Sequence, residues 1–373
     1  MSGVIKLGVV ALAGTDNGGT YQYTLSTLQA LRHTTGFAVT IYGDPDNADF
    51  RTLGYPISSF SEPRRQQLAA LAAHRLGIRL PDPFASEDIL LAPIYALTLL
   101  HTSKPFAFTL HDLQECYYPQ NFSRLQRAWH HQVYHALLAR ARRVICESRY
   151  VQTDISRFFG TPDRNIVVMT APPQSQFFLA QGPAQLAAAR ARLKLPEKFL
   201  FYPAQFWAHK NHLRLIEAFR GVADEFPEVK LVLTGKTRDE YAAVMAAVDK
   251  LGLNDKVLHL GFIGTNDLQS VYQLATALAM PSLFESVSIP IYEAFQVGTP
   301  VAASNVLAIP EQVGDAALLF DPTSPASIKD ALATLLRDRD AARALGAKGK
   351  ARMAAMTPER YGAELQELLT RLR

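Results

Sequence analysis

Two glutamates, Glu285 and Glu293, lie eight residues apart in the stretch LFESVSIPIYEAFQVGTP. The first follows the apolar run ALAMPSLF, which predicts a buried strand and its loop, and the second lies in the helix-like run IYEAFQV. In an open parallel sheet, ligands bind at the carboxyl ends of strands beside helix N-termini, which attract phosphate. Two carboxylates beside such an anion site suit a ligand with both a diphosphate and hydroxyl groups. A nucleotide sugar has both.

The residues around the pair support a site, because a glutamate pair at this spacing also arises by chance. Pro290 lies near the expected helix start, where its missing N–H costs nothing. Gly298 then ends the helix before Pro300, and TPVAAS follows as another short buried strand. The sequence therefore predicts a unit of strand, loop, helix and strand with both acids on its ligand side.

A lysine with polar and aromatic neighbours lies in the first expected strand-to-helix loop of the second half, FYPAQFWAHKNHLRL. Lys210 in this loop can neutralise a departing diphosphate without a metal ion, and Asn211 is a candidate helix cap. Gln205, Trp207 and His209 crowd the same loop. A surface lysine is the alternative interpretation, but this polar and aromatic density is unusual for a simple turn.

Two further candidates lie in the first half. Gly18 and Gly19 open an expected helix after the first strand, where glycines let the backbone approach a ligand, although most such pairs are turns and the G-x-G-x-x-G pattern is absent. His111 and Asp112 end the strand FAFTLHD. A histidine there can donate to a sugar hydroxyl or to a developing charge, and a structural strand-end histidine is the alternative.

Length and composition indicate a globular protein of two domains, since 373 residues exceed what one core usually organises. Cys116 and Cys146 cannot form a disulfide framework and have no metal-ligating neighbours, which favours a reducing compartment. The N-terminal MSGVIKLGVVALAG is typical of a first strand rather than a signal peptide. Because no apolar stretch approaches the roughly 20 residues of a membrane span, a soluble or peripheral protein is expected.

Positive charge is concentrated in the first half. Residues 1–195 contain 19 basic and 13 acidic side chains, whereas the remainder contains 19 and 21. Much of the excess lies in 124–157, where arginines and histidines alternate with Trp129, Tyr134 and leucines. This composition suits a helix on an anionic membrane surface, and a solvated helix face is the alternative. Nucleic acid is not an expected partner, because no binding motif for it is present.

Strand-like and helix-like runs alternate throughout, which predicts an α/β protein with parallel sheets. The strands of the first half are expected at IKLGVVAL, AVTIYG, DILLAPI, FAFTLHD, RVICES and NIVVMTA. A proline-rich segment, 172–196, is the expected linker, after which a second series starts at FLFYPA. We therefore expect a domain over 1–171 and another over 197–357, with a ligand cleft between them. A C-terminal helix over about 358–373 is expected to pack back on the first domain.

The order of these motifs resembles the retaining glycosyltransferases of family 4, which have the GT-B fold: two Rossmann-like doubly wound domains facing each other across a cleft. The most specific parts of this resemblance are the glutamate pair followed by GTPVAAS, the run IPEQVGDAALLFDP, and HKNHLRLIEAF. The resemblance implies that Lys210 contacts the donor diphosphate and Glu293 the donor ribose. It places Glu285 by the transferred sugar and His111 in the sugar pocket. Gly18 and Gly19 would approach the phosphates.

Two departures from the family pattern affect the expected donor site. Gln205 stands where the family commonly has an arginine, so one positive charge on the diphosphate is missing. Ser286-Val287-Ser288 replaces the usual Gly-Phe-Gly, leaving backbone N–H groups to face the ligand. The other expected donor-binding residues are Phe262, beside the base, and Ile289. Tyr21 and Asp112 are expected on the acceptor side.

These observations lead to one functional hypothesis. The chain is expected to transfer a hexose or deoxyhexose, mannose or rhamnose, from a nucleoside diphosphate sugar, with a GDP-sugar favoured, to a glycan or lipid-linked glycan acceptor. The resemblance implies retention of configuration, and no metal or cofactor is expected. The expected location is the cytoplasm, at the inner face of the membrane. The alternatives are an epimerase or hydrolase of the same fold, a catalytically inactive binding protein, and an inverting enzyme with Asp112 as its base.

Overall fold

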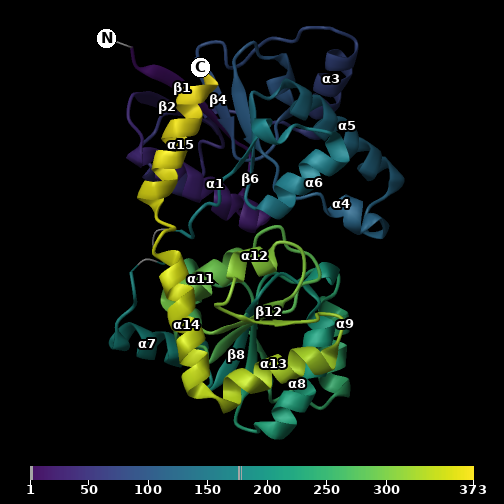
Figure 1. Cartoon of the computed structure of the whole chain (residues 1–373), viewed down its shortest axis with the longest axis vertical. Coiled ribbons are helices and arrows are strands. Elements are labelled where there is room, and N and C mark those ends of the chain that lie inside the picture. The colour runs from purple at the N-terminus through teal and green to yellow at the C-terminus, as the bar shows by residue number, and fades with distance from the viewer. Residues whose placement is uncertain (1–2, 175–176, 178) are drawn as a thin grey trace. The chain divides into compact units, whose positions relative to one another are not determined.

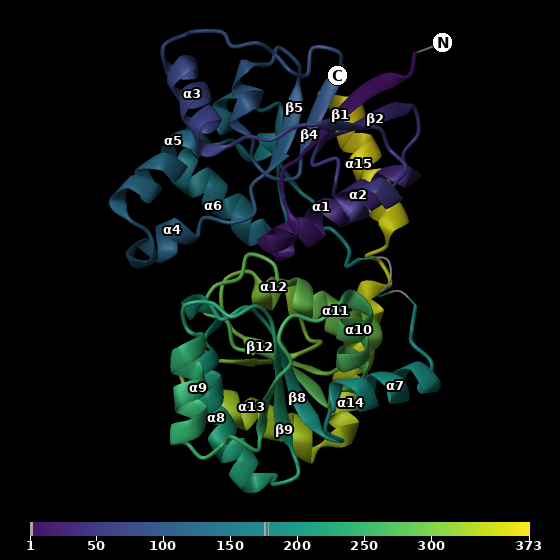
Figure 2. The ribbon, with the colours of Figure 1, turned by 180° about the vertical axis from the view of Figure 1, so that it is seen from behind.

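The chain folds into two compact units. The computed structural model describes residues 3–174, 177 and 179–373. Unit 1 comprises Met1–Pro172 and Met356–Arg373, and unit 2 comprises Pro173–Ala355. In each unit, helices flank a central sheet (Figures 1 and 2). The predicted class, α/β with two doubly wound parallel sheets, is therefore confirmed.

The sheet of unit 1 has, within the described residues, the strand order β3-β2-β1-β4-β5-β6-β7, and each pairing is parallel. Its strands are β1 Ile5–Ala11, β2 Phe37–Gly43, β3 Ile57–Ser59, β4 Ile89–Ala92, β5 Phe106–Thr109, β6 Arg143–Cys146 and β7 Ile166–Val168. The order reverses between β1 and β4, and a crevice at the carboxyl ends of the strands is expected at such a point.

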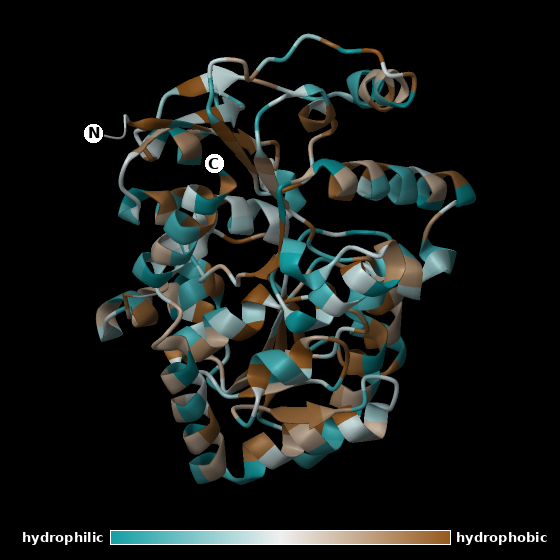
Figure 3. Cartoon of the chain, turned by 45° about the horizontal axis from the view of Figure 1, so that its top comes forward, coloured by the Kyte–Doolittle hydropathy of each residue, from teal (hydrophilic) through white to brown (hydrophobic). Residues whose placement is uncertain are grey.

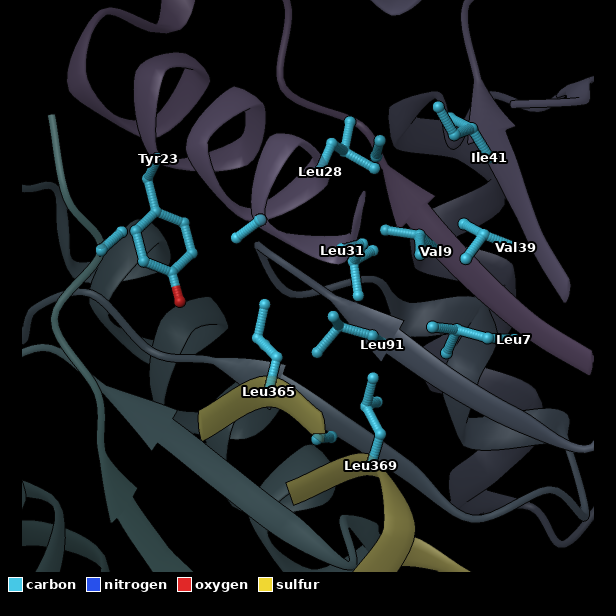
Figure 4. Packing of buried hydrophobic residues seen from close by; sticks show 14 of the residues in the cluster. Leu7, Val9, Tyr23, Leu28, Leu31, Val39, Ile41, Leu91, Leu365 and Leu369 are labelled. Atoms are coloured by element: carbon cyan, nitrogen blue, oxygen red, sulfur yellow. The ribbon is translucent and has the colours of Figure 1, made fainter. Parts of the chain in front are cut away.

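Helices cover both faces of this sheet. They are α1 Gly19–Ala30, α2 Ala48–Thr52, α3 Arg64–Arg75, α4 Gln114–Tyr117, α5 Arg124–Arg140, α6 Arg149–Phe159 and α15 Pro358–Leu372. Alternate residues of β1 enter opposite layers of the core: Leu7 and Val9 pack with α1 and α15, whereas Val10 packs on the other face. Figure 4 shows Leu365 and Leu369 of α15 in the first of these clusters.

The sheet of unit 2 has the order β10-β9-β8-β11-β12-β13 in the described residues, again with parallel pairings. Its strands are β8 Phe199–Pro203, β9 Lys230–Thr234, β10 Val257–His259, β11 Ala277–Met280, β12 Val301–Ser304 and β13 Leu318–Phe320. Its helices are α7 Pro183–Leu193, α8 His212–Glu225, α9 Tyr241–Lys250, α10 Thr265–Leu274, α11 Ile289–Val297, α12 Ile309–Val313, α13 Pro325–Arg337 and α14 Arg339–Met353. In Figure 3 the strands are mainly hydrophobic and the helices are mixed.

Two packing features of unit 2 bear on the expected site. Helix α11 packs closely against α14 at Gly349. A Cβ at this position would come within 2.3 Å of Phe295, so only glycine permits this approach. The segment expected as a linker, 172–196, includes α7, which contacts α10. Residues 175, 176 and 178 of that segment lie outside the described residues. No helix in the described part of the chain has the length and apolarity needed to cross a bilayer.

Candidate active site

A charge pair lies at the carboxyl ends of β8 and β11 in unit 2. Lys210 Nζ donates to Glu285 Oε1 at 2.6 Å. The side chains are 20% and 8% exposed, respectively. Each comes from the loop that follows its strand, as the sequence predicts. The structure thus brings together the predicted cation and the first of the two predicted acids.

Hydrogen bonds fix the loops that carry this pair. The Leu283 N–H donates to His209 O at 2.7 Å, and the Tyr202 hydroxyl donates to Lys210 O at 2.7 Å. Asn211 has a φ of 60°, a left-handed conformation that asparagine tolerates. Its side-chain amide donates to Pro281 O and Pro322 O at 2.9 and 2.8 Å. Asn211 is the N-cap residue of α8, as predicted, but its side chain makes no capping hydrogen bond, and its amide joins three loops instead.

Two neutral histidines surround Lys210. Burial, followed by the charge of Lys210, lowers the pKa of His209 to about 3 and that of His212 to about 3. The His212 ring stacks on Phe206 with a centroid distance of 4.3 Å. These rings are uncharged at neutral pH and partly exclude water, so the charge on Lys210 is screened less than it would be in water.

Glu293 lies inside unit 2. Its side chain is buried, and Oε2 accepts a hydrogen bond of 2.7 Å from the hydroxyl of Tyr272 on α10. In the described part of the chain, Oε1 has no hydrogen-bond partner. Burial raises the pKa of Glu293 to about 7, and the Tyr272 hydrogen bond only partly offsets this. The two predicted glutamates therefore differ in environment: Glu285 is paired with a cation, whereas Glu293 has an unsatisfied oxygen and titrates near neutral pH.

The raised pKa of Glu293 predicts a distinctive pH dependence of stability. The pKa of Glu293 is about 7 in the folded chain, against an ordinary value of 4.5. Its contribution to stability is therefore fully present below pH 4.5 and is lost as the pH rises through about 7. Between about pH 5 and about pH 8, the free energy of unfolding of the wild type should fall by roughly 2–3 kcal/mol relative to that of Glu293→Gln. Urea unfolding of both proteins at each pH measures this. The contributions of all other titrating groups cancel in the stability difference between the two proteins. A difference that does not vary with pH would therefore contradict the prediction.

The residues between the two glutamates provide fewer free backbone donors than expected. The Ser288 N–H donates to Gln312 Oε1 at 2.9 Å, and Gln312 Nε2 donates to Ser288 O at 2.6 Å. The expectation that this N–H faces a ligand is therefore wrong, because α12 already satisfies it. Ser286, Val287 and Ile289 are half-buried.

The remaining donor-side candidates differ in exposure. Gln205 is half-buried in the loop after β8. Phe262 is 72% exposed in the loop after β10. The Lys236 Nζ lies 5.5 Å from the centroid of the Phe262 ring, so this aromatic side chain has a cation for a neighbour. An exposed ring at this edge suits a planar base, and the contact of Phe262 with the donor base stays a prediction.

Unit 1 contains a cavity of about 930 Å³ at the carboxyl ends of its strands. Its wall comes mainly from the loops after β1, β2, β3, β4 and β5. The acidic residues that line it are Asp16, Asp44, Asp46, Asp49, Glu62 and Asp112. Among the described residues, no lysine or arginine lines it. Its interior is therefore rich in hydrogen-bond acceptors and unfavourable for anions.

His111 lines the cavity with both ring nitrogens engaged. Nδ1 lies 2.9 Å from Glu147 Oε2, and Nε2 lies 2.9 Å from Pro93 O. When Glu147 is ionised, both partners are acceptors, so this arrangement favours the doubly protonated imidazolium form of the ring. Burial lowers the pKa of His111, but the hydrogen bond and charge of Glu147 outweigh it and raise the pKa overall. In this structure both ring nitrogens of His111 are engaged within unit 1, and its expected donation to a sugar hydroxyl stays a prediction.

The other first-half candidates surround this cavity. Gly18 is the N-cap residue of α1 with a φ of 55°, Gly19 is the first residue of that helix, and the neighbouring Asn17 lines the cavity. Asp112 lines it as well, and its Oδ1 accepts the N–H of Gln114 at 3.1 Å. Tyr21 is buried and donates to Asp49 Oδ2 at 2.6 Å, and burial raises its pKa. In this structure the Tyr21 hydroxyl holds Asp49, a wall residue, in place, and the expected contact of Tyr21 with an acceptor stays a prediction.

Sequence reasoning missed Glu147, the partner of His111. It ends the predicted strand RVICES just as His111 ends FAFTLHD. Because β5 and β6 are neighbours in the sheet, their carboxyl ends meet. A search for charged residues at the ends of successive strands would have found the pair. The same search would have found the acidic loop residues Asp44, Asp46 and Asp49, since their loop follows a predicted strand directly.

Two doubly wound parallel-sheet units are the architecture of the GT-B fold of glycosyltransferases, and solved structures share this fold. A structure titled Anabaena Alr3699/HepE in complex with UDP and glucose aligns with a TM-score of 0.79 at 18% identity, covering 98% of this chain and 99% of that one. Sucrose-phosphate synthase from Thermosynechococcus elongatus aligns with a TM-score of 0.79 at 21% identity, covering 99% of each chain.

The family follows from the sequence comparisons. Residues 17–170 match Glycosyltransferase Family 4, and residues 187–352 match Glycosyl transferases group 1. The chain therefore belongs to the glycosyltransferases of this family. O-antigen chain mannosyltransferase RfbU of Salmonella typhimurium is 23% identical over 91% of this chain and 92% of the relative. O-antigen chain mannosyltransferase B of Escherichia coli is 26% identical over 64% of this chain and 63% of the relative.

Proposed function

We propose that this glycosyltransferase moves mannose or rhamnose, with retention of configuration, from a nucleoside diphosphate sugar to a hydroxyl of a glycan or lipid-linked glycan in polysaccharide biosynthesis. The Lys210–Glu285 pair, at 2.6 Å between the loops of β8 and β11, is the observation that carries the proposal. The relatives named as O-antigen mannosyltransferases support the sugar and the pathway class. A GDP-sugar is our proposed donor, and a UDP-sugar is its competitor because a structural neighbour is titled with UDP.

In the proposed reaction, the bond between the sugar C1 and the diphosphate oxygen breaks through an oxocarbenium-like state. The acceptor oxygen forms its bond to C1 on the same face, and its proton passes to the leaving phosphate oxygen. The Lys210 ammonium offsets the charge that develops on the diphosphate. Orientation of the two substrates and this electrostatic stabilisation are each worth several kcal/mol. The reaction then requires neither a metal ion nor a dedicated base.

Glu293 has the chemistry to hold the donor ribose. Its Oε1 has no hydrogen-bond partner among the described residues, and a buried carboxyl oxygen without one is costly. A ribose hydroxyl would supply that partner. Because the side chain is only 2% exposed, donor binding would have to open the layer over α11.

The cavity of unit 1 is the proposed acceptor site. Its acidic wall accepts hydrogen bonds from sugar hydroxyls and disfavours phosphate. One of these acids, Glu62, already serves the fold, because it accepts the N–H groups of Leu97 and Thr98 at 2.9 and 2.5 Å. A glycan end therefore suits this cavity, and an anionic lipid carrier would have to bind elsewhere.

A basic surface on unit 1 is the proposed contact with an anionic membrane. The expected segment, 124–157, includes α5, and α3 lies beside it: the Arg64 guanidinium lies 3.7 Å from the Trp129 ring centroid. Neither 63–81 nor 123–146 contains an acidic residue. Large apolar side chains are exposed within these two segments at Leu68, Leu76, Ile78 and Leu125. Arginines with exposed aliphatic neighbours suit a lipid interface. Sedimentation with anionic vesicles tests this, and absence of binding at low salt would contradict it.

Product analysis with a sugar-labelled donor tests the proposed reaction. We expect label on the glycan only when acceptor is present, with the anomeric configuration of the donor retained in its NMR spectrum. Release of free sugar would indicate a hydrolase, and isomerised donor without acceptor would indicate an epimerase. An inverted product would point to Asp112 as a base. An unchanged donor under all conditions would indicate a binding protein and contradict the proposal.

A further inference from the structure

The loops that follow β8 and β9 are in direct contact in unit 2. A Cβ on Gly235 would lie 2.4 Å from Ala204 O, so a side chain at this position would collide with the neighbouring loop. Backbone hydrogen bonds join the loops as well: the Phe206 N–H donates to Lys236 O at 3.4 Å, and the Glu240 N–H donates to Phe206 O at 3.1 Å. The loop after β9 is therefore held beside the loop that carries Lys210.

Arg238 reaches from the β9 loop to the β8 loop. Its Nε donates to Gln205 Oε1 at 2.9 Å, and its guanidinium carbon lies 5.1 Å from the Trp207 ring centroid. The side chain is half-buried. Within the described residues, its Nη atoms have no hydrogen-bond partner and the guanidinium has no ion pair. Arg238 is thus a positioned cation whose outer N–H groups are available to a ligand.

The charges at this edge of unit 2 show why a second cation matters. Lys210 is paired with Glu285, so together these two side chains have no net charge. A diphosphate carries more than one negative charge and would meet little net attraction from this pair alone. The guanidinium of Arg238 is uncompensated, and its planar N–H fork matches phosphate oxygens.

We propose that Arg238 binds the diphosphate of the nucleotide sugar and that Gln205 and Trp207 hold it in position for this purpose. The inference rests on the proposed function, because it assumes a diphosphate donor in unit 2. Gln205, interpreted in the sequence as the loss of a cation, then serves to orient another one. On this proposal, Arg238 supplies the positive charge that the sequence predicts to be missing at Gln205.

Calorimetric titration of the full chain with a nucleoside, its monophosphate and its diphosphate tests this role. Arg238→Met keeps the aliphatic stem and removes the charge. We expect it to weaken diphosphate binding by about 10–100-fold and to leave nucleoside binding unchanged. Arg238→Lys should recover part of the loss, since it restores the charge without the fork. Arg343→Met, at an exposed ion pair on α14, is the matched control and should bind like wild type.

Two results would overturn the proposal while leaving the proposed function intact. One is diphosphate binding by Arg238→Met within about twofold of wild type, well below the loss expected for a charged hydrogen bond. The other is an equal loss of nucleoside and diphosphate binding, which would show that Arg238 only joins the two loops. Failure of the wild-type chain to bind any nucleoside diphosphate would instead contradict the proposed function itself, and this proposal with it.

Discussion

Replacing Lys210 by methionine is expected to lower kcat by about 10²–10³-fold, the usual effect of removing one group that stabilises developing charge. The ammonium is the predicted partner of the leaving diphosphate, and its buried, apolar surroundings strengthen that interaction. Initial rates of sugar transfer at saturating donor measure the effect. Because the loss concerns the transition state, KM for the donor should change less than kcat.

The Lys210–Glu285 contact adds a stability effect that the sequence did not predict. Lys210→Met leaves Glu285, 8% exposed, without its cation, which should cost about 3 kcal/mol. The double variant with Glu285→Gln removes the isolated charge and should recover most of that stability. It should remain inactive, so folding and catalysis are separated. Near-normal turnover in either variant would remove Lys210 from the mechanism.

His111→Ala is expected to lower the free energy of unfolding by about 3–5 kcal/mol, as removal of one partner of a buried ion pair does. The lost contact is the 2.9 Å bond to Glu147, whose side chain is 7% exposed. Urea unfolding near neutral pH measures the loss. In a double-mutant cycle, the combined variant with Glu147→Gln should lose much less than the sum of the single variants. Additive losses would contradict the predicted interaction between His111 and Glu147.

The pH dependence of the His111 variant follows from its raised pKa. A folded-state pKa above the ordinary value gives a stabilising contribution that is full below about pH 6.5 and is lost as pH rises through the folded value. The cost of His111→Ala should therefore shrink at alkaline pH. This direction is opposite to that of a histidine buried in its neutral form, such as His212.

Much of the architecture could be predicted because each long strand has a continuous apolar run. The runs around β1, β5 and β6 each predict a strand, and the residues at their ends were assigned to the correct edge. Elements over 48–80 were missed: β3 has only three residues, and the large apolar side chains of α3 are limited to Leu68 and Leu71. Their place depends on pairing and packing with distant segments, which local periodicity does not report.

The environments of the site residues were less predictable than their locations. The helical pattern around Glu293 places it on α11, but the packing of α10 and α14 against that helix and the hydrogen bond from Tyr272 on α10 set its environment. Similarly, the sequence puts His111 at a strand end without showing that β6 supplies an acid beside it. Both outcomes arise from contacts between elements that are far apart in the chain.

Thermal unfolding with GDP, UDP, ADP and dTDP tests the central claim most directly, namely that this chain binds a nucleoside diphosphate through Lys210. A ligand that binds only the folded state stabilises it by about 2.7 kcal/mol at a concentration of 100 times Kd. We predict that at least one diphosphate, GDP first, raises the Tm of wild type in a concentration-dependent way and raises that of Lys210→Met much less. No shift with any of the four, or equal shifts in the variant, would contradict the account.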